Sequence, residues 1–539
     1  MDKKSRKRKQ KRSLLGQARK YGRKGQYGRG THVGEDVYQY FLKIYEMKLE
    51  EFETEEEKIT FANNALKETE DQEVHLSSNQ FVSRVIEKLL PFSNDDILFK
   101  FVSSFSDLRI LSTDNYASHV LQTLIKVCAS RFREKGESSD ESKYCEYVKR
   151  VSLFIFNNLE EFIEDPYANQ IGRCCLQECS GNESNKPLSS EIVDNLALRI
   201  MKWPTLDFVT NNELASGFMQ VLLTSLSKTD LKLTQKLIKK LLNECFLIED
   251  VKLENTDVEN IFSSMAATRL LEAMIEVSTG KRYTQILSML FLSRLTLLSC
   301  NKKCFICIQK LISSCQDLSE LKLINVELIP NFEKLISAGN LGVLVEMAKA
   351  CIRLKSSEGE FLKGLKEALK AEHSSNGELV LKLLFLSGDT VNKNGSLLLQ
   401  TLFQFKKPIS IVENLLSVDT NKLKEIFLDP KGSYIVDAYV SSKTIGEKSR
   451  DRLIHKFKGH YKDLVLDKFG SRVVEALWSR ASLKEKHLIM SELDRSICRT
   501  VPGSIIASKF RLDLYLYDKT KWANSETKSV VKIFSEIVA

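Results

Sequence analysis

A six-residue pattern recurs along this chain and constrains its fold more than any other feature. Each copy has a small residue, then Ser or Asn, a flat or cationic side chain, two apolar residues, and Glu, Gln or Asp. The best copies occupy residues 82–87, 117–122, 432–437 and 470–475. Because an α-helix has about 3.6 residues per turn, the second and sixth residues share one face while the apolar pair points toward the core. The pattern therefore predicts a set of similar helices, each with two polar side chains on one surface.

The sixth residues of the copies act as a ruler along the chain. We place them at Glu87, Gln122, Arg173, Gln220, Glu272, Gln309, Glu346, Gln400, Asp437, Glu475 and Leu512. The regular steps lie close to 37 residues, which suits two or three short helices, and the longer steps contain insertions. Asp165-Pro166 and Asp429-Pro430 are helix-start signals just before two of the copies. We therefore expect about eleven helical repeats in a curved α-solenoid, C- or U-shaped, with the pattern on its concave face.

Composition favours an all-α protein that binds rather than catalyses. Only 8 Pro and 23 Gly interrupt 539 residues, and strict alternation of apolar and polar residues is scarce. No Ser-His-Asp order, phosphate-binding Gly-rich loop or HExxH motif is present, so we expect no enzyme activity and no cofactor. Cys300, Cys304 and Cys307 have a spacing that zinc could use, but one apolar helix face explains it better, and we expect no metal.

Other features of the sequence concern compartment and packing. No uncharged apolar run approaches the roughly 20 residues that span a bilayer, so we expect a soluble protein without membrane contact. The 12 Cys occur without a secretory signal, which predicts reduced thiols in an intracellular protein. Trp203, Trp478 and Trp522 are expected to anchor helix junctions by packing.

The second, third and sixth residues of each copy form a group that we call a fork. Its second and sixth residues, the edge residues, can hydrogen-bond the edge of a nucleobase, while the third, the stacking residue, can cover the face of that base. A single fork would be an ordinary solvated helix surface. Repetition in register makes a nucleic-acid surface the better interpretation.

These residues resemble the Pumilio (PUF) repeat family, and the insertions, the basic N-terminus and the repeat count resemble its nucleolar protein 9 branch. The resemblance covers residues 35–539 and implies a right-handed superhelix of Pumilio-like repeats. It implies that the concave face binds single-stranded or partly structured RNA, with one base at each repeat. It also implies a nucleolar protein of small-subunit ribosome biogenesis, which binds precursor ribosomal RNA in the 18S region and its flanking spacer and controls processing without catalysis.

The resemblance assigns roles to fork residues by position. Ser83 with Glu87 is similar to the guanine-type edge pair and Ser118 with Gln122 to the adenine-type pair, whereas Arg173 replaces the usual acid or amide and is expected on phosphate or sugar. The complete set of expected RNA contacts is Ser83, Arg84, Glu87, Ser118, His119, Gln122, Asn169, Gln170, Arg173, Arg269, Glu272, Ser433, Tyr434, Asp437, Ser471, Arg472 and Glu475. Central repeats depart from the pattern at their stacking positions, which hold Gly217, Ile306, Val343 and Leu397. We therefore expect contacts near the two ends of the array and a spacer or protein contact between them.

Positive charge is concentrated at the N-terminus. Residues 1–30 hold 13 Lys or Arg and one acid, so the rest of the chain has a net charge of about −3. We expect residues 1–34 to be a disordered basic tail for nuclear and nucleolar targeting that also touches RNA phosphates. The targeting cluster is Lys3, Lys4, Arg6, Lys7, Arg8, Lys9, Lys11 and Arg12. The alternative is a tail that only improves solubility.

Two other functions fit the same helical pattern. A Pumilio-type messenger RNA regulator would keep intact forks through the middle and would not need a nucleolar tail. An armadillo- or HEAT-like adaptor would hold a peptide in its groove, and substitution of the forks would leave RNA binding unchanged. In the ribosomal interpretation the partners are precursor ribosomal RNA and proteins of the pre-ribosomal particle, with no small-molecule substrate, and the chain is a monomer.

Overall fold

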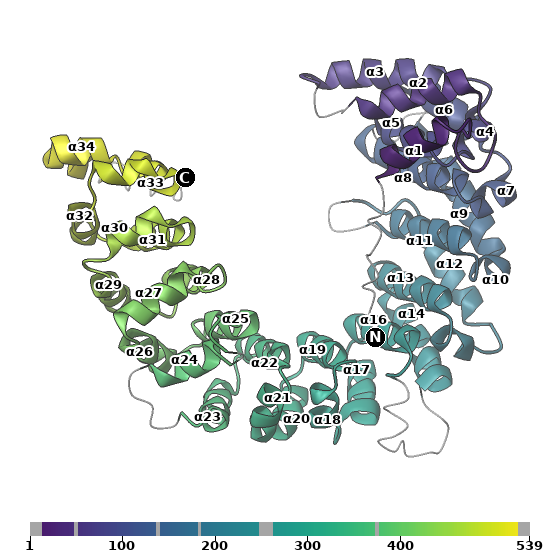
Figure 1. The fold of residues 1–539 in the computed structure, drawn as a ribbon. Coiled ribbons are helices and arrows are strands. Elements are labelled where there is room, and N and C mark those ends of the chain that lie inside the picture. The colour runs from purple at the N-terminus through teal and green to yellow at the C-terminus, as the bar shows by residue number, and fades with distance from the viewer. Residues whose placement is uncertain are drawn as a thin grey trace, which may run out of the picture. The chain divides into compact units, whose positions relative to one another are not determined.

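The computed structural model describes residues 13–47, 52–135, 141–181, 185–246, 262–371, 377–386 and 388–526. In these ranges the regular structure is helical, apart from one isolated bridge between Gly30 and Asn79, so the all-α prediction is confirmed. The chain divides into two compact units, Met1–Arg282 and Tyr283–Ala539 (Figure 1). No helix of the described residues is both long and apolar enough to cross a membrane.

The first unit is a stack of helical repeats. Its helices are α1 (Leu14–Gly22), α2 (Glu35–Glu46), α3 (Glu55–Lys67), α4 (Glu73–Ser77), α5 (Val82–Leu89), α6 (Asp95–Ser104), α7 (Leu108–Thr113), α8 (Ala117–Lys135), α9 (Glu141–Asn157), α10 (Leu159–Phe162), α11 (Pro166–Ser180), α12 (Ser190–Ile200), α13 (Glu213–Thr229), α14 (Leu231–Leu241) and α16 (Met265–Val277), while α17 (Lys281–Ile286) spans the division. The forks lie on α5, α8, α11, α13 and α16, and each of these helices packs against the next.

The second unit repeats the same plan. Its helices are α18 (Leu295–Cys300), α19 (Phe305–Ser314), α20 (Leu318–Leu328), α21 (Phe332–Ser337), α22 (Leu341–Arg353), α23 (Glu358–Ala368), α24 (Glu378–Leu384), α25 (Lys393–Leu402), α26 (Ile409–Ser417), α27 (Thr420–Leu428), α28 (Ser433–Ser441), α29 (Glu447–Lys456), α30 (Tyr461–Leu466), α31 (Lys468–Arg480), α32 (Leu483–Ser491), α33 (Val501–Lys509) and α34 (Leu512–Tyr517). The helices α19, α22, α25, α28, α31 and α33 pack in succession, so the ruler helices form one layer within each unit. This arrangement is an α-solenoid.

A side chain caps the first turn of most fork helices and sets their register. The Asp165 carboxylate accepts hydrogen bonds from the backbone N of Tyr167 and Ala168, at 2.9 and 2.8 Å. The same arrangement recurs at Asn79, Asp114, Asn212, Ser264, Asn392, Asp429, Asp467 and Thr500. Each cap satisfies backbone donors that a helix start would otherwise leave free. The helix start predicted at Asp165 is confirmed. The start predicted at Asp429 is wrong by three residues, because Asp429 holds the turn before the helix and Gly432 is the N-cap of α28.

The cap register corrects the last mark of the ruler. Thr500 Oγ1 accepts from the backbone N of Gly503 at 3.2 Å, which places the last fork at Ser504, Ile505 and Ser508 in α33. Leu512 instead begins α34 and is buried. The last mark is therefore Ser508, which lies closer to Glu475 than the predicted spacing of about 37 residues.

The glycine before each of the forks on α28 and α31 has a steric cause. A Cβ added to Gly432 would collide with the carbonyl oxygen of Ile426, and one added to Gly470 would collide with that of Leu464. The preceding helix therefore ends directly against the start of the fork helix. Only a residue with little or no side chain fits between them.

Residues 13–34, predicted to lie in a disordered tail, are ordered in the structure. They form α1, which packs on α2, and a loop in which Val33 is buried. The Asn79 side-chain amide donates to the backbone O of Tyr27 and Thr31, at 2.9 and 3.0 Å, and thereby holds a Gly-rich segment that has no apolar pattern of its own. The predicted targeting residues from Lys3 to Arg12 lie outside the described residues.

Nine of the twelve cysteines are buried in the interior of the repeats, whereas Cys245 and Cys300 are partly exposed and Cys498 is exposed. All 12 are free thiols. The single helix face predicted for Cys300, Cys304 and Cys307 is wrong, because Cys300 ends α18, Cys304 is the N-cap of α19, and Cys307 lies in α19. Burial raises the pKa of the Cys128 and Cys174 thiols to about 12, so they stay protonated near neutral pH. Among the described residues, no three His, Cys, Asp or Glu side chains converge in a way that suits a metal ion.

Candidate nucleic-acid interface

The first edge residues are buried between neighbouring fork helices. Those of the six predicted forks are at most 8% exposed: Ser83, Ser118, Asn169, Thr268, Ser433 and Ser471. The Ser471 hydroxyl donates to the carbonyl of Lys468 in its own helix at 3.0 Å. The Ser118 hydroxyl has no hydrogen-bond partner in the described part of the chain. The prediction that both edge residues are exposed is therefore wrong for the first one. Adjacent helices pack closely over this smaller side chain.

Several first edge residues also connect one repeat to the next. Ser216 Oγ donates to the carbonyl of Ala266 in the following fork helix at 2.7 Å, and Gln220 Nε2 donates to Ser216 Oγ at 3.0 Å. Ser396 and Gln400 repeat this chain of bonds, with Ser396 Oγ donating to the carbonyl of Lys431 at 2.8 Å. The bonds to Ala266 and Lys431 join residues 50 and 35 positions apart, and the sequence pattern contains no signal for them.

The stacking residues lie on the open side of the same helices. Tyr434 is 54% exposed, and Arg472, Arg269 and Gln170 are exposed as well. An exposed Tyr ring gains nothing from the protein core, whereas it offers a flat surface to a ligand. The structure thus places a flat or cationic side chain where a base can cover it.

Arg84 and His119 are half-buried neighbours on consecutive fork helices. Burial, together with the positive charge of Arg84, lowers the pKa of His119, so its ring is neutral near pH 7. The His119 ring also meets the Tyr167 ring edge-on, with centroids 6.3 Å apart. In the first two forks, Arg84 is therefore the cationic stacking residue and His119 is a neutral aromatic one.

The acidic edge residues pair with cations close to them. Arg84 Nη1 lies 3.1 Å from Glu87 Oε2, and Arg269 Nη1 lies 2.9 Å from Glu272 Oε2. Burial raises the pKa of Glu87 against the opposing charge of Arg84. Burial likewise raises the pKa of Asp437, and the positive charge of Arg472 opposes this. Fork arginines therefore orient the carboxylates of Glu87 and Glu272, whereas Glu475 pairs with Lys509 of the next fork helix at 2.8 Å.

Arg173 covers the stacking position of the next repeat. Its Nη2 donates to the carbonyl of Leu214 at 3.1 Å, and a Cβ added to Gly217 would lie only 2.7 Å from its Cζ. Burial lowers the pKa of the Arg173 guanidinium. Gly217 leaves the room that this guanidinium occupies, so the repeat without a stacking side chain receives a flat cation from its neighbour. The sequence signal for this arrangement was Gly217 itself, a residue without a side chain at the stacking position of a helix.

We expect the Gly217→Ala variant to retain full stability. Its Cβ meets the far end of a flexible Arg side chain, which can move, while Ala favours a helix by up to about 1 kcal/mol over Gly. Urea denaturation followed by circular dichroism measures the effect. A loss above about 1 kcal/mol would show that Arg173 is fixed in place.

Two central stacking positions expose aliphatic side chains. Ile306 and Leu397 are partly exposed, while Val343 is buried. Gln309 covers Gly342 in the same manner as Arg173 covers Gly217, since a Cβ on Gly342 would lie 3.0 Å from Gln309 Cδ. None of the stacking positions at Ile306, Val343 and Leu397 holds an aromatic or guanidinium side chain.

The sequence of this chain matches the NOP9-like PUF repeat domain family over residues 71–195 and 188–496. The chain belongs to the NOP9-like PUF repeat family. Both the predicted Pumilio resemblance and its nucleolar branch are thereby confirmed.

Relatives of this NOP9-like PUF chain align with most of it. Pumilio homolog 23 of Arabidopsis thaliana is 24% identical over 87% of this chain and 70% of its own length. Nucleolar protein 9 of Homo sapiens is 23% identical over 92% of this chain and 89% of its own length. The solved structure of APUM23-GGAAUUGACGG has a TM-score of 0.73 at 22% identity and covers 92% of this chain and 99% of that chain, which shows a shared fold.

Proposed function

We propose that this chain binds precursor ribosomal RNA of the small subunit on its fork surface. It is an RNA-binding protein of ribosome biogenesis in the nucleolus, and the RNA segment is the 18S region with its flanking spacer. The observation that carries the proposal is that flat or cationic side chains lie in pairs on neighbouring fork helices, next to polar edge residues. Arg84 and His119 are half-buried on α5 and α8, and Tyr434 and Arg472 are exposed on α28 and α31. The names Nucleolar protein 9 and APUM23-GGAAUUGACGG, which belong to relatives, support both the compartment and the class of ligand.

Each fork contributes complementary contacts to one base. The Tyr434 ring or the Arg472 guanidinium stacks on the base, and stacking is worth roughly 1–3 kcal/mol per base. An ionised Glu87 or Glu475 accepts hydrogen bonds from adjacent donors on a guanine edge. The Gln122 amide offers a donor and an acceptor to an adenine edge, whereas the Ser118 hydroxyl is buried and does not reach a base.

Binding is strongest in two separate groups of forks, one in each unit. The first group surrounds Arg84 and His119, and the second surrounds Tyr434 and Arg472. Between these groups, the aliphatic stacking positions at Ile306 and Leu397 favour a spacer or a contact with proteins of the pre-ribosomal particle. The protein acts by covering RNA as a monomer, without catalysis, so that folding or cleavage of the covered segment waits until release.

Crosslinking to RNA in cells tests the identity of the ligand. We expect reads from small-subunit precursor RNA and fewer reads after Arg84→Ala combined with Arg472→Ala. Reads concentrated in messenger RNA would favour the messenger regulator instead. Recovery of protein partners without RNA, unaffected by these substitutions, would favour the adaptor.

A pair of tyrosine variants tests the site itself. Tyr434→Ala should weaken binding of the recovered RNA segment by about 1–3 kcal/mol, because one stacked base loses its aromatic platform. Tyr517→Ala is the matched control, since Tyr517 is 86% exposed but lies in α34 outside any fork. Fluorescence anisotropy titration measures both. Equal affinities for the two variants would rule out the fork as the binding site.

A further inference from the structure

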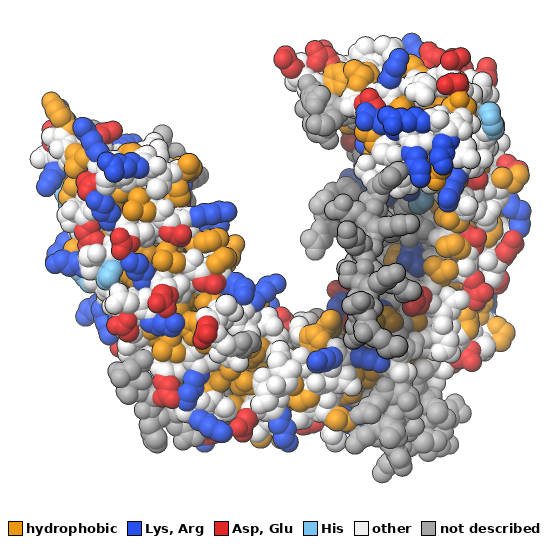
Figure 2. Space-filling view, in the orientation of Figure 1, with side chains coloured by type: hydrophobic (Ala, Val, Ile, Leu, Met, Phe, Trp, Pro, Cys, Tyr) orange, Lys and Arg blue, Asp and Glu red, His pale blue; other side chains and the backbone are white. Residues whose placement is uncertain are grey.

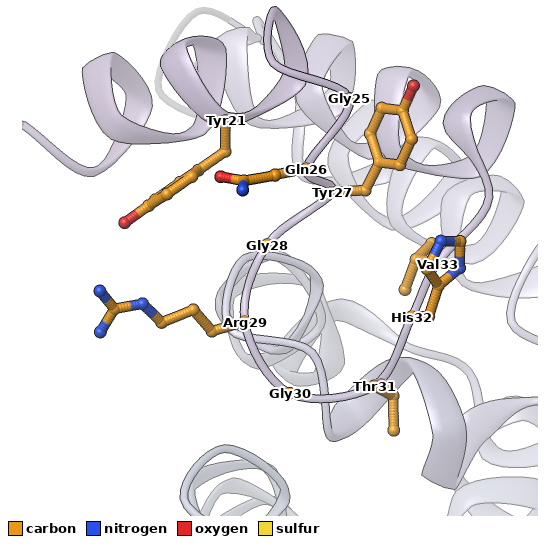
Figure 3. Close-up of a pocket in the computed structure, with 10 residues that line it drawn as sticks. All are labelled: Tyr21, Gly25, Gln26, Tyr27, Gly28, Arg29, Gly30, Thr31, His32 and Val33. Carbon is orange, nitrogen blue, oxygen red and sulfur yellow. The ribbon is translucent and has the colours of Figure 1, made fainter.

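A pocket lies in the loop that Asn79 holds against the start of α5, within the segment predicted to be a disordered tail. It has a volume of about 460 Å³ and is lined by residues 21 and 25–33. Figure 3 shows the side chains of Tyr21, Gln26 and Arg29 pointing to the same side of the loop, while Tyr27 and Val33 point away. In the described residues, no hydrogen bond or ion pair engages the side chains of Tyr21, Gln26 or Arg29. Pockets of this volume commonly hold small ligands.

The backbone of this pocket is held in place by the first fork helix. Asn79 binds the loop on both sides through the carbonyls of Tyr27 and Thr31, and its Oδ1 accepts from the backbone N of Phe81 and Val82 at the start of α5. The backbone N of Gln80 donates to the carbonyl of Arg29 at 2.8 Å. The loop and the Ser83–Arg84–Glu87 fork are therefore positioned by one buried side chain, and the pocket is formed before any ligand arrives.

The charge around the pocket favours a polyanion. Residues 13–34 contain five Arg or Lys and no Asp or Glu. Arg19 pairs with Glu46, whereas Lys20, Arg23, Lys24 and Arg29 form no ion pair within the described ranges. Figure 2 shows Lys and Arg side chains gathered over the region where Figure 1 places α1, α5 and α8. A phosphate group would meet little competition from internal acids here.

We propose that this pocket binds one further nucleotide of the RNA strand, next to the base that faces the first fork. The Tyr21 ring stacks on that base, the Gln26 amide offers a donor and an acceptor to its edge, and the Arg29 guanidinium binds its phosphate. The pocket lies outside the fork pattern, so it extends the binding site beyond the repeats. The inference rests on the proposed function, because the forks must bring the strand to the pocket.

Extended oligonucleotides test this pocket. The probes are GGAAUUGACGG alone and the same RNA with four uridines, one of them 4-thiouridine, added at the 5′ or the 3′ end. We expect one of the two extensions to tighten binding to the full chain at least about fivefold, as one stacked base requires. Tyr21→Leu and Arg29→Ala should remove this gain, whereas Tyr21→Phe, which keeps the ring, should retain it. Arg23→Ala is the charge-matched control, because Arg23 does not line the pocket, and it should retain the gain as well.

Photocrosslinking separates this proposal from the proposed function. Irradiation should join the 4-thiouridine to the peptide that contains Tyr21. If Tyr434→Ala leaves RNA binding unchanged but the Tyr21 crosslink forms, the fork proposal fails and the pocket stands. No crosslink to this peptide from either extension, or a gain that survives both Tyr21→Leu and Arg29→Ala, would overturn the pocket.

Discussion

Replacing Trp522 with Ala is expected to lower the free energy of unfolding of the C-terminal repeats by about 3–5 kcal/mol. Trp522 is fully buried, and its indole N donates to the carbonyl of Phe510 at 2.9 Å. Its ring also meets Trp478, which stacks on the Phe510 ring with centroids 3.8 Å apart. The substitution removes a large apolar side chain, leaves a cavity, and leaves the Phe510 carbonyl without this donor.

The effect of Trp522→Ala should be local, because repeats in a solenoid depend mainly on their neighbours. Hydrogen exchange of the amides in α33 and α34 reports it directly. Tyr517→Ala removes another large aromatic side chain only five residues away, and its exposure predicts a change within about 0.5 kcal/mol. Equal protection of α33 in Trp522→Ala and the wild type would show that Trp522 does not anchor this end.

Gly432→Ala is expected to destabilise the second unit by about 2–3 kcal/mol, although Ala ordinarily favours a helix over Gly. The added Cβ would collide with the carbonyl oxygen of Ile426, and a backbone atom cannot swing aside as a side chain can. The start of α28 must therefore move, and Ser433, Tyr434 and Asp437 move with it. RNA binding should weaken together with stability.

Gly359→Ala is the matched control for Gly432→Ala. Gly359 lies in the first turn of α23, and nothing approaches the position of its Cβ within 4 Å. We expect this variant to be unchanged or stabilised by up to about 1 kcal/mol. Urea denaturation of the two variants measures the contrast. Similar free energies of unfolding would mean that the second unit adjusts to a Cβ at the fork without cost.

The sequence was sufficient to predict the parts of this fold that depend on local chemistry. The cap residue Asp165 marked where a fork helix begins, because its side chain bonds to backbone groups two and three residues away. The role predicted for Trp522 is confirmed by its burial. The Pumilio pattern was visible because its chemistry lies within one helical turn.

Features that depend on distant contacts could not be predicted in this way. Asn79 holds a loop 52 residues earlier in the chain, so the Gly-rich segment looked disordered when considered alone. The burial of Ser471 and the position of Arg173 over Gly217 both depend on how closely neighbouring helices approach. A spacing of 37 residues also could not show that the last repeat is shorter. In each case, packing between repeats decided the outcome.

The bonds from Gln220 to Ser216 and on to the carbonyl of Ala266 have a consequence for how such an array can diversify. The amide available to a base shares a hydroxyl with the joint to the adjacent module. A substitution that alters nucleotide preference therefore also alters the packing between neighbouring repeats, so the two properties cannot evolve independently. Engineered transfer of one recognition pair to another module would succeed only when the facing helix is transferred with it.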